Sequence, residues 1–331
     1  LAVSPTALTF NYTFGGALPA SQNISITNAG SGALAWTASD SDFWVGLSPV
    51  SGAAPGSLAV SVNPANLAAG THTSNLQITS AGTAGSPATV VITLVVQGTQ
   101  PAGNITAVGN GASFQPGFAS ATWVTIFGTN LSQSTQSWQA ADFVGGKLPT
   151  SLDGVSVTID GVAAYVEFIS PTQINVLAPD DAVVGTVQVQ VTVAGQTSNS
   201  LAAQKQQYAP AFFTIDGGAL VAARHLNGTL VSATQPAAPG EVIELYATGF
   251  GPTNPPFPTA DLVTTAVPLP ANSVQVTVGG IAATVGFTGL TESGLYQFNV
   301  TMPSLPNGDA AVVSQIDNVQ TQAGVSIPIQ Q

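Results

Sequence analysis

The sequence predicts an all-β chain built of three β-sandwich domains in a row. Short runs in which apolar and polar residues alternate, such as SLAVSVN at 57–63, recur between clusters of Gly, Pro, Ser and Asn. This is the pattern of strands separated by turns. Apolar residues at helical spacing do not extend over a useful length. A chain of 331 residues suits two or three domains that each bury a core, and a duplication after residue 105 favours three.

The composition argues against several classes of function. Only 5% of the residues are charged while 44% are hydrophobic, which favours a folded chain over a disordered one. The strong bases are Lys147, Lys205 and Arg224 against a net charge of -12, so nucleic acid is not an expected partner. No apolar run approaches the about 20 residues that cross a bilayer, and membrane insertion is not expected. The lack of cysteine excludes disulfides and thiolate metal sites.

Residues 1–98 form the first predicted sandwich. Turn clusters separate its alternating runs, which include ISIT at 24–27 and ALAW at 33–36. Trp36 alternates with Leu34 and is expected to fill the core. The segment QGTQPAGN at 97–104 interrupts the strand pattern with Gly, Pro and polar residues, and it predicts a linker.

An internal duplication defines the second and third predicted domains, residues 105–206 and 207–331. WVTIFGTNL (123–131) aligns with VIELYATGF (242–250), and VSVTIDGVAAYVEF (155–168) aligns with VQVTVGGIAATVGF (274–287), each pair 119 positions apart. The offset grows to 124 between QINV (173–176) and QFNV (297–300), so about five residues are inserted in the second copy, within FTGLTESGLY. Asn227-Gly228 predicts an additional hairpin at the start of the third domain.

The duplicated strands have one apolar face and one mixed face. Val124 and Ile126 match Ile243 and Leu245 and should point into each core, because side chains alternate along a strand. Trp123, Thr125 and Phe127 should then meet solvent, a neighbouring domain or another subunit. The amides of QINV and QFNV share a face in the same way. We expect them to bond to neighbouring strands or an adjoining domain rather than to a ligand.

Two family resemblances support this organisation. Residues 1–98 resemble a BACON-type immunoglobulin-like module through LAVSPTALTF, Trp44, SPVSG and SLAVSVN. Residues 105–331 resemble the C-terminal region of large secreted proteins of Solibacter and other Acidobacteria through NGASFQPGFASATWVTIFGTNLS, PAAPGEVIELYATGFGPT and GLYQFNVTMP. The two sandwiches of this region also resemble IPT/TIG domains. These resemblances imply three tandem immunoglobulin-like sandwiches, with a spacer or carbohydrate-associated role for the first, and they imply no catalytic residues.

Candidates for catalysis are weak. His72 and His225 are the only histidines, and no G-x-S-x-G elbow accompanies them. The close carboxylate pairs Asp40/Asp42, Asp180/Asp181 and Glu241/Glu244 lie at loop edges, where such residues make turns. A calcium site at Asp180–Asp181 is a minor alternative. We therefore expect no enzyme activity, no metal and no cofactor.

Aromatic side chains are the stronger candidates for a binding surface or an interface, because sugars stack on exposed rings and interfaces concentrate Trp and Tyr. Trp138 lies in the polar loop SQSTQSWQAADF and is either an exposed anchor or folded back on its own sandwich. The other candidates are Trp123, Phe127, Tyr246 and Trp44. Of these, Trp44 fits a core position better than a ligand site.

The resulting functional hypothesis is a non-catalytic extracellular structural protein. It would be a cell-surface or filament subunit that self-associates into a homopolymer through sandwich contacts or strand exchange. The alternative is a carbohydrate-binding or adhesion module with glycans as partners. The scarcity of Lys, the polar residues rich in Ser, Thr, Asn and Gln, and the strand pattern beginning at Leu1 favour an extracellular chain whose signal peptide has been removed.

Overall fold

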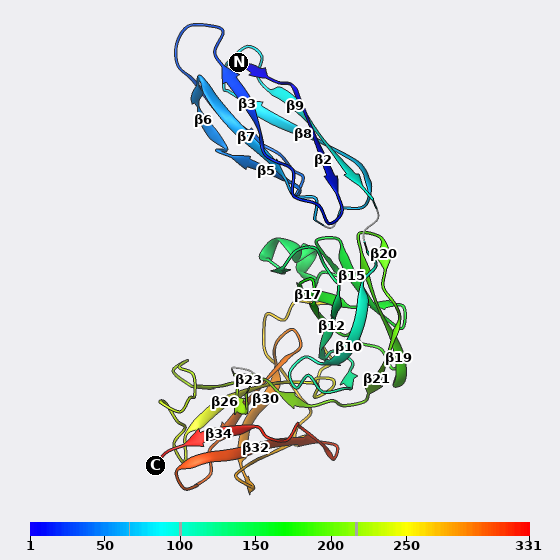
Figure 1. The fold of residues 1–331 in the computed structure, drawn as a ribbon. Helices are drawn as coiled ribbons and strands as arrows, with labels where there is room; N and C mark the ends of the chain where they lie inside the picture. Colours follow the sequence, from blue (N-terminus) through cyan, green and yellow to red (C-terminus); the bar gives the residue numbers. More distant parts are fainter. Residues whose placement is uncertain (66, 99–100, 216–217) are drawn as a thin grey trace. The chain divides into compact units, whose positions relative to one another are not determined.

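The protein folds into two compact units, Leu1–Pro101 and Ala102–Gln331 (Figure 1). The computed structural model describes residues 1–65, 67–98, 101–215 and 218–331. Strands form both units, and the short 3₁₀ turns Ala140–Asp142 and Val144–Gly146 lie in the second unit. Within the described ranges, no helix has the length and apolarity needed to span a membrane.

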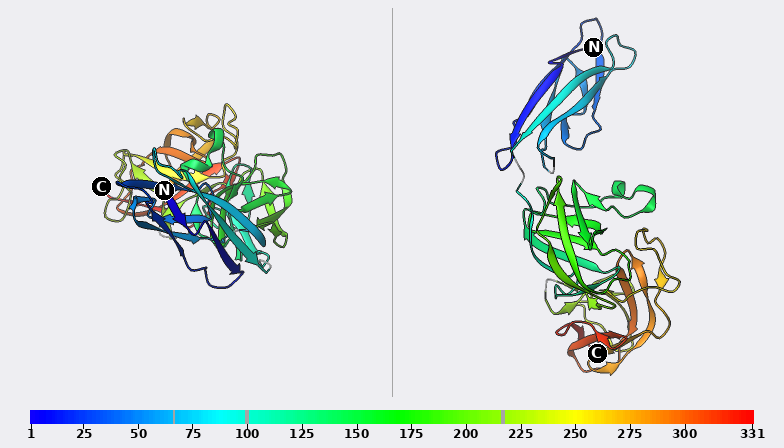
Figure 2. Two further views of the ribbon diagram at one scale, coloured as in Figure 1. Left: turned by 90° about the horizontal axis from the view of Figure 1, so that it is seen from above. Right: turned by 90° about the vertical axis from the view of Figure 1, so that its right-hand side faces the viewer.

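The first unit is a sandwich of two sheets (Figure 2). The strand orders are β1-β3-β7-β5 in one sheet and β2-β9-β8-β4-β6 in the other. Its strands are β1 (Ala2–Ser4), β2 (Ala7–Thr13), β3 (Gln22–Thr27), β4 (Leu34–Ser39), β5 (Val45–Ser48), β6 (Ser51–Ala54), β7 (Gly56–Val62), β8 (Gly70–Thr79) and β9 (Ala88–Gln97). Trp36 is buried in the core between these sheets, as the sequence predicts. Gly52 makes room for it, because a Cβ there would lie 2.8 Å from Trp36 Cζ2.

The predicted linker falls between β9, which ends at Gln97, and β10, which begins at Asn104. Residues 99 and 100 of that linker lie outside the described residues.

The second unit begins with a sandwich of sheets ordered β10-β12-β18-β17-β13 and β11-β21-β19-β15-β14. Its strands are β10 (Asn104–Asn110), β11 (Phe118–Ala119), β12 (Trp123–Thr129), β13 (Gln136–Ser137), β14 (Ser151–Leu152), β15 (Val155–Ile159), β16 (Val162–Ala163), β17 (Tyr165–Ile169), β18 (Gln173–Leu177), β19 (Gly185–Val193), β20 (Gln196–Thr197) and β21 (Leu201–Gln206). Val124 and Ile126 point into its core and are fully buried.

A second sandwich follows with sheets ordered β22-β26-β31-β30-β27 and β23-β24-β34-β32-β28-β29. Its strands are β22 (Ala211–Phe212), β23 (Thr214–Ile215), β24 (Leu220–Val221), β25 (Ala223–His225), β26 (Val242–Thr248), β27 (Val267–Pro268), β28 (Val274–Val278), β29 (Ile281–Ala282), β30 (Thr284–Glu292), β31 (Leu295–Thr301), β32 (Gly308–Ile316), β33 (Val319–Gln320) and β34 (Ser326–Ile329). Ile243 and Leu245 are buried in its core, as expected.

The duplication is visible strand by strand. Strands β12, β15, β16 and β17 start 119 residues before β26, β28, β29 and β30, and the paired strands hold equivalent places in their sheets. The turn Asp160-Gly161 joins β15 to β16 with positive φ at both residues, and Gly279-Gly280 does the same between β28 and β29.

The sandwiches have separate cores within one compact unit. A domain boundary at residues 206/207 stays a prediction.

The insertion in the second copy lengthens one hairpin. Strand β30 spans nine residues where its counterpart β17 spans five, and the hairpin tip, Ser293-Gly294, reaches the first sandwich. Gly294 O accepts a hydrogen bond from Thr248 Oγ1 at 2.9 Å, and that hydroxyl accepts one from Trp123 N at 3.2 Å. The inserted hairpin therefore joins the two sandwiches.

Candidate functional site

A cavity of about 540 Å³ lies in the second unit, between the mixed face of the first sandwich and the tip of the β30–β31 hairpin. We call it the aromatic cleft. The first sandwich contributes Trp123, Thr125, Trp138, Phe143, Glu167 and Asn175. Leu262, Val263, Glu292 and Ser293 face them from the second sandwich. The mixed face thus meets the neighbouring sandwich, which was one of the three expected alternatives, and Thr125 is buried there.

Three aromatic rings line one side of the cleft. The ring centroids of Trp123 and Trp138 lie 5.7 Å apart and those of Trp138 and Phe143 lie 5.2 Å apart, each pair with the planes at 67°. Such edge-to-face pairs stabilise by about 0.5–1.5 kcal/mol each beyond area burial. The result is a fixed group of rings rather than three independent side chains.

Local backbone bonds hold these rings in place. Trp138 follows β13, and its N–H donates to Glu167 O at 2.8 Å. Phe143 lies between the two 3₁₀ turns. The first turn is capped by a hydrogen bond from Gln139 N to Asp142 Oδ2 at 2.6 Å. Trp138 is half-buried and packs against the first sandwich. It therefore folds back on its own domain and still presents an edge to the cleft.

A hydrogen-bonded polar group stands beside the rings. Asn175 Oδ1 accepts from Thr125 Oγ1 at 3.1 Å and from Gln173 Nε2 at 2.9 Å, and Asn175 Nδ2 donates to Glu167 Oε2 at 3.5 Å. Burial raises the pKa of Glu167, and the hydrogen bond from Asn175 opposes that rise. The cleft therefore combines apolar rings with a fixed carboxylate and amide.

The Gln-x-Asn motif itself belongs to the scaffold. In the second sandwich Gln297 Nε2 donates to Asn299 Oδ1 at 2.8 Å and to Glu244 Oε1 at 3.0 Å. The amides thus bond within the sheet in both copies, as expected. The cleft arises where the copies differ, since Trp123 and Glu167 align with Val242 and Gly286.

A backbone connection, which we call the latch, closes one side of the cleft. Leu148 N donates to Ala260 O at 2.8 Å, Leu262 N donates to Gly146 O at 2.9 Å, and Lys147 pairs with Asp261. The latch joins the 3₁₀ loop of the first sandwich to the long β26–β27 loop of the second. Phe143 lies just before the latch on the first loop and Val263 just after it on the second, and both line the cleft.

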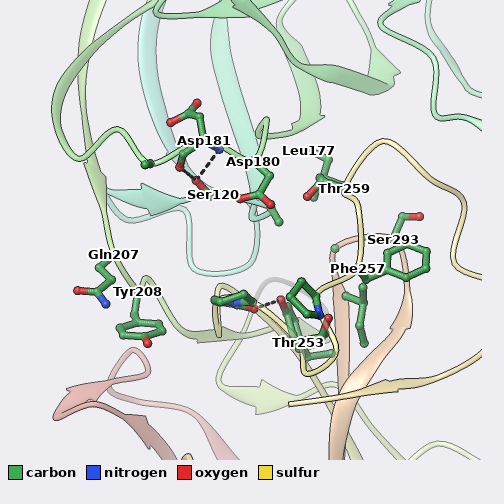
Figure 3. Close-up of a pocket in the computed structure, with 18 of the residues that line it drawn as sticks. Ser120, Leu177, Asp180, Asp181, Gln207, Tyr208, Thr253, Phe257, Thr259 and Ser293 are labelled. Carbon is green, nitrogen blue, oxygen red and sulfur yellow. Dashed lines mark hydrogen bonds between the residues drawn. The ribbon is translucent and has the colours of Figure 1, made fainter. Parts of the chain in front are cut away.

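A second cavity of about 550 Å³, which we call the junction cavity, adjoins the cleft (Figure 3). Asp180, Leu177 and Ser120 lie on one side, while Tyr208, Thr253 and Phe257 lie on the opposite side.

Two buried contacts fix the walls of the junction cavity. Lys205, whose side chain is 1% exposed, donates to Asp181 Oδ1 at 2.6 Å. Tyr296 OH donates to Gly251 O, and burial raises the pKa of Tyr296. Asp181 Oδ1 accepts hydrogen bonds from Lys205 Nζ and from Val183 N. Asp181 therefore stabilises the conformation of this loop.

The structure brings together two of the five aromatic candidates. Trp138 and Trp123 both line the cleft, whereas Phe127 lies outside it with its ring centroid 6.1 Å from that of Phe114. Tyr246 lies on the second sandwich, where its OH donates to Glu244 Oε2 at 3.1 Å and Arg224 sits over its ring. Trp44 is removed from the binding candidates: it is 4% exposed and buried in the first core, the position that the sequence favoured, so its ring is not available to a ligand.

Phe143 and Glu167 were not singled out from the sequence. Glu167 could have been found, because it alternates with buried Val166 on a duplicated strand and replaces Gly286 of the other copy. Phe143 gives no such signal, since its loop has no counterpart.

Both histidines and the pair Asp40/Asp42 are engaged in local contacts. His225 Nδ1 lies 2.6 Å from Glu241 Oε1, and His72 Nε2 lies 2.9 Å from Ala68 O. Asp40 and Asp42 both accept hydrogen bonds from Ser74 Oγ. Within the described part of the chain, no group of three or more His, Cys, Asp or Glu could hold a metal ion.

Comparison with known families supports the β-sandwich assignment. Residues 1–99 match the model of the Viral BACON domain, and residues 112–208 match the model of the IPT/TIG domain. No curated protein matches the chain. The link to secreted proteins of Acidobacteria stays a prediction.

Solved structures with similar folds include two glycan-binding proteins and a cadherin. The SGBP-B protein of the Bacteroides ovatus mixed-linkage glucan utilization locus, in complex with a mixed-linkage heptasaccharide, is 12% identical over 99% of this chain and 70% of that chain, with a TM-score of 0.30. The surface glycan-binding protein PbSGBP-B of Prevotella bryantii is 13% identical over 69% and 41% (TM-score 0.21). Mouse cadherin-23 EC22-24 is 12% identical over 99% and 98% (TM-score 0.21).

Proposed function

We propose that the protein is a non-catalytic extracellular module that binds carbohydrate in the aromatic cleft. The observation that carries this proposal is the group Trp123–Trp138–Phe143 standing beside Glu167 and Asn175 in one cavity. A sugar ring has apolar C–H faces that pack on aromatic rings, and its hydroxyl groups donate to carboxylate oxygens such as those of Glu167, which Asn175 holds in place. Mostly apolar cavities with a few fixed polar groups are typical ligand sites.

The charges around the cleft favour a neutral glycan. Glu167 and Glu292 line it, and the cation of the latch, Lys147, is paired with Asp261. With a net charge of -12 on the chain, an anionic polysaccharide would be repelled at long range. We therefore expect binding to uncharged polysaccharides and none to polyuronates.

Affinity electrophoresis tests this proposal. The full chain would be run through gels that contain hydroxyethyl-cellulose, xylan, mannan, mixed-linkage glucan or polygalacturonate. Trp138→Ala is expected to weaken binding to a neutral polysaccharide at least about tenfold, the effect of losing an aromatic anchor. Glu167→Gln keeps the shape of the side chain and is expected to weaken binding less. Phe114→Ala removes an exposed ring outside the cleft and serves as the matched control.

Two results would oppose the proposal. The first is that no neutral polysaccharide retards the wild type. The second is that the Trp138 and Phe114 variants behave alike while both remain folded.

A structural role through self-association remains the second candidate, and an edge strand favours it. β2 lies at the end of its sheet, spans seven residues and carries no charged side chain, whereas natural edges are usually protected by charges. One of its carbonyls, Thr9 O, already accepts from Gln22 Nε2 at 2.8 Å. β1 and β2 also pair within their own sheets, so strand exchange requires them to leave those sheets.

Negative-stain microscopy of the concentrated protein tests assembly. Filaments that disappear in a Thr9→Lys/Asn11→Lys variant would support a subunit that polymerises through the β2 edge. A protein that stays monomeric at high concentration would contradict this second candidate without bearing on carbohydrate binding.

A further inference from the structure

We infer that the junction cavity is a second subsite for the same ligand, so that the protein binds an extended neutral oligosaccharide across both cavities rather than a single terminal sugar. This inference rests on the proposed function. Beyond the proposed function, it specifies that the ligand is an oligosaccharide long enough to reach both cavities and that a second set of residues recognises it.

The two cavities share part of their lining. Val263 and Ser293 line both cavities. Gly294 lies between Trp123 of the cleft and Leu177 of the junction cavity: a Cβ on it would come within 2.6 Å of Trp123 Nε1 and 2.5 Å of Leu177 Cδ1. A ligand that fills one cavity therefore ends beside the other.

The junction cavity repeats the chemistry of the aromatic cleft. Tyr208 and Phe257 supply half-buried rings, and Thr253 and Thr259 supply buried hydroxyl groups (Figure 3). Asp180 is exposed at the cavity and accepts no hydrogen bond from any described residue, unlike Asp181. Its carboxylate is free to accept from ligand hydroxyl groups, as Glu167 is placed to do in the cleft.

Both cavities exclude the same kinds of ligand. The cation at the junction cavity, Lys205, is buried and paired with Asp181, and the cation of the latch is paired with Asp261. The lining of the two cavities includes Asp180, Glu167 and Glu292. A chain that crosses both is therefore expected to be uncharged along its length, since a like charge beside these carboxylates is unfavourable.

Isothermal titration calorimetry with oligosaccharides of increasing length tests the inference. The full chain would be titrated with cello-, xylo- and manno-oligosaccharides from the disaccharide to the hexasaccharide. We expect affinity to rise with length. Tyr208→Ala is expected to lower the affinity for the hexasaccharide about tenfold and to leave the disaccharide unchanged. Trp138→Ala is expected to lower both.

Two further variants separate recognition from folding. Asp180→Asn preserves the size of the side chain and should also weaken only the longer ligands. Asp309→Asn, an exposed carboxylate on β32, is the matched control and should change nothing.

The outcomes are distinguishable. If the disaccharide binds as tightly as the hexasaccharide and Tyr208→Ala and Asp180→Asn affect neither, the ligand ends in the aromatic cleft; the second subsite is then wrong and the proposed function stands. Equal loss for both lengths in Tyr208→Ala would also overturn the inference. If the wild type binds none of the oligosaccharides or polysaccharides, the proposed function itself fails.

Discussion

Gly294 shows at the scale of one residue how the two sandwiches of the second unit fit together. Its φ of +71° lies in the left-handed region, and a Cβ would collide with Leu177 and Trp123. Gly280 has a similar φ of +78°, but nothing lies within 4 Å of its Cβ position. The two glycines share a left-handed backbone conformation, which would be strained in any other residue, and they differ in packing.

We therefore predict that Gly294→Ala destabilises the second unit more than Gly280→Ala. Both substitutions cost about 1–2 kcal/mol for the left-handed backbone, and Gly294→Ala adds about 1–3 kcal/mol for overpacking. Denaturant unfolding of both variants would measure the difference. Equal losses would show that the hairpin tip moves away without cost.

His225 and Glu241 form a pair whose contribution depends on pH. The hydrogen bond to Glu241 raises the pKa of His225 above 6.5. For Glu241, burial acts to raise the pKa, but the bonds from Ala238 N and His225 together lower it below 4.5. Because the pKa of His225 is higher in the folded state, its protonation contributes stability that is fully present below about pH 6.5. That contribution is lost as the pH rises through the folded-state pKa. The lowered pKa of Glu241 gives a contribution to stability that is present above about pH 4.5 and is lost as the pH falls through its folded-state pKa.

We expect His225→Gln to destabilise the protein at about pH 6 and to have less effect at about pH 9, because the charged pair exists at the lower pH. The effect should stay within about 1 kcal/mol, as for other ion pairs near a surface. Urea unfolding at both pH values, with His72→Gln as the control, measures it. A larger effect at the higher pH would contradict the assigned sign.

At the scale of elements, the sequence predicts the strands that occur in both copies of the duplication, and it does not predict the contacts made by segments that occur in one copy. The apolar faces of β12 and β26 follow from the alternation of Val124 and Ile126, and the insertion in the second copy follows from the change of offset. The consequence of that insertion, a hairpin tip that packs on Trp123, depends on contacts more than 100 residues apart in sequence. No local pattern encodes such a contact, and for the same reason Phe143 was not predicted.

The two ion pairs of Lys147 and Lys205 hold loops in different ways. Lys147 is 59% exposed, and two backbone hydrogen bonds support the same latch. Lys205 is 1% exposed and anchors the loop that carries Asp180 and Asp181. An exposed pair is worth little because water competes for both charges, whereas removal of one partner from a buried pair leaves the other uncompensated.

We predict that Lys147→Met changes the free energy of unfolding by less than about 1 kcal/mol and that Lys205→Met lowers it by about 3 kcal/mol. Chemical denaturation of the two variants gives both values under one condition. Similar small effects would mean that Asp181, which is 23% exposed, regains water when Lys205 is removed.

For the whole molecule, we predict fewer independently unfolding parts than sandwiches. The described residues form three hydrophobic cores. The second and third belong to one compact unit, in which the latch, the hairpin tip and the hydrogen bond from Asn110 Nδ2 to Ala209 O at 2.9 Å join them. The sequence predicts the cores because each has its own periodic strands. It does not predict the coupling, which depends on loops that differ between the copies.

Differential scanning calorimetry of the full chain should accordingly resolve two transitions, one for Leu1–Pro101 and one for Ala102–Gln331, because each compact unit is expected to unfold as one cooperative transition. Gly294→Ala should lower the temperature of the second transition by at least several degrees, as expected for a loss of about 2–5 kcal/mol in a domain of this size, and leave the first in place. A saturating neutral oligosaccharide should raise only the second, since ligand binding stabilises the unit that holds the site. Three transitions would show that the sandwiches of the second unit unfold independently, and a ligand-induced shift of the first would place the carbohydrate site in Leu1–Pro101.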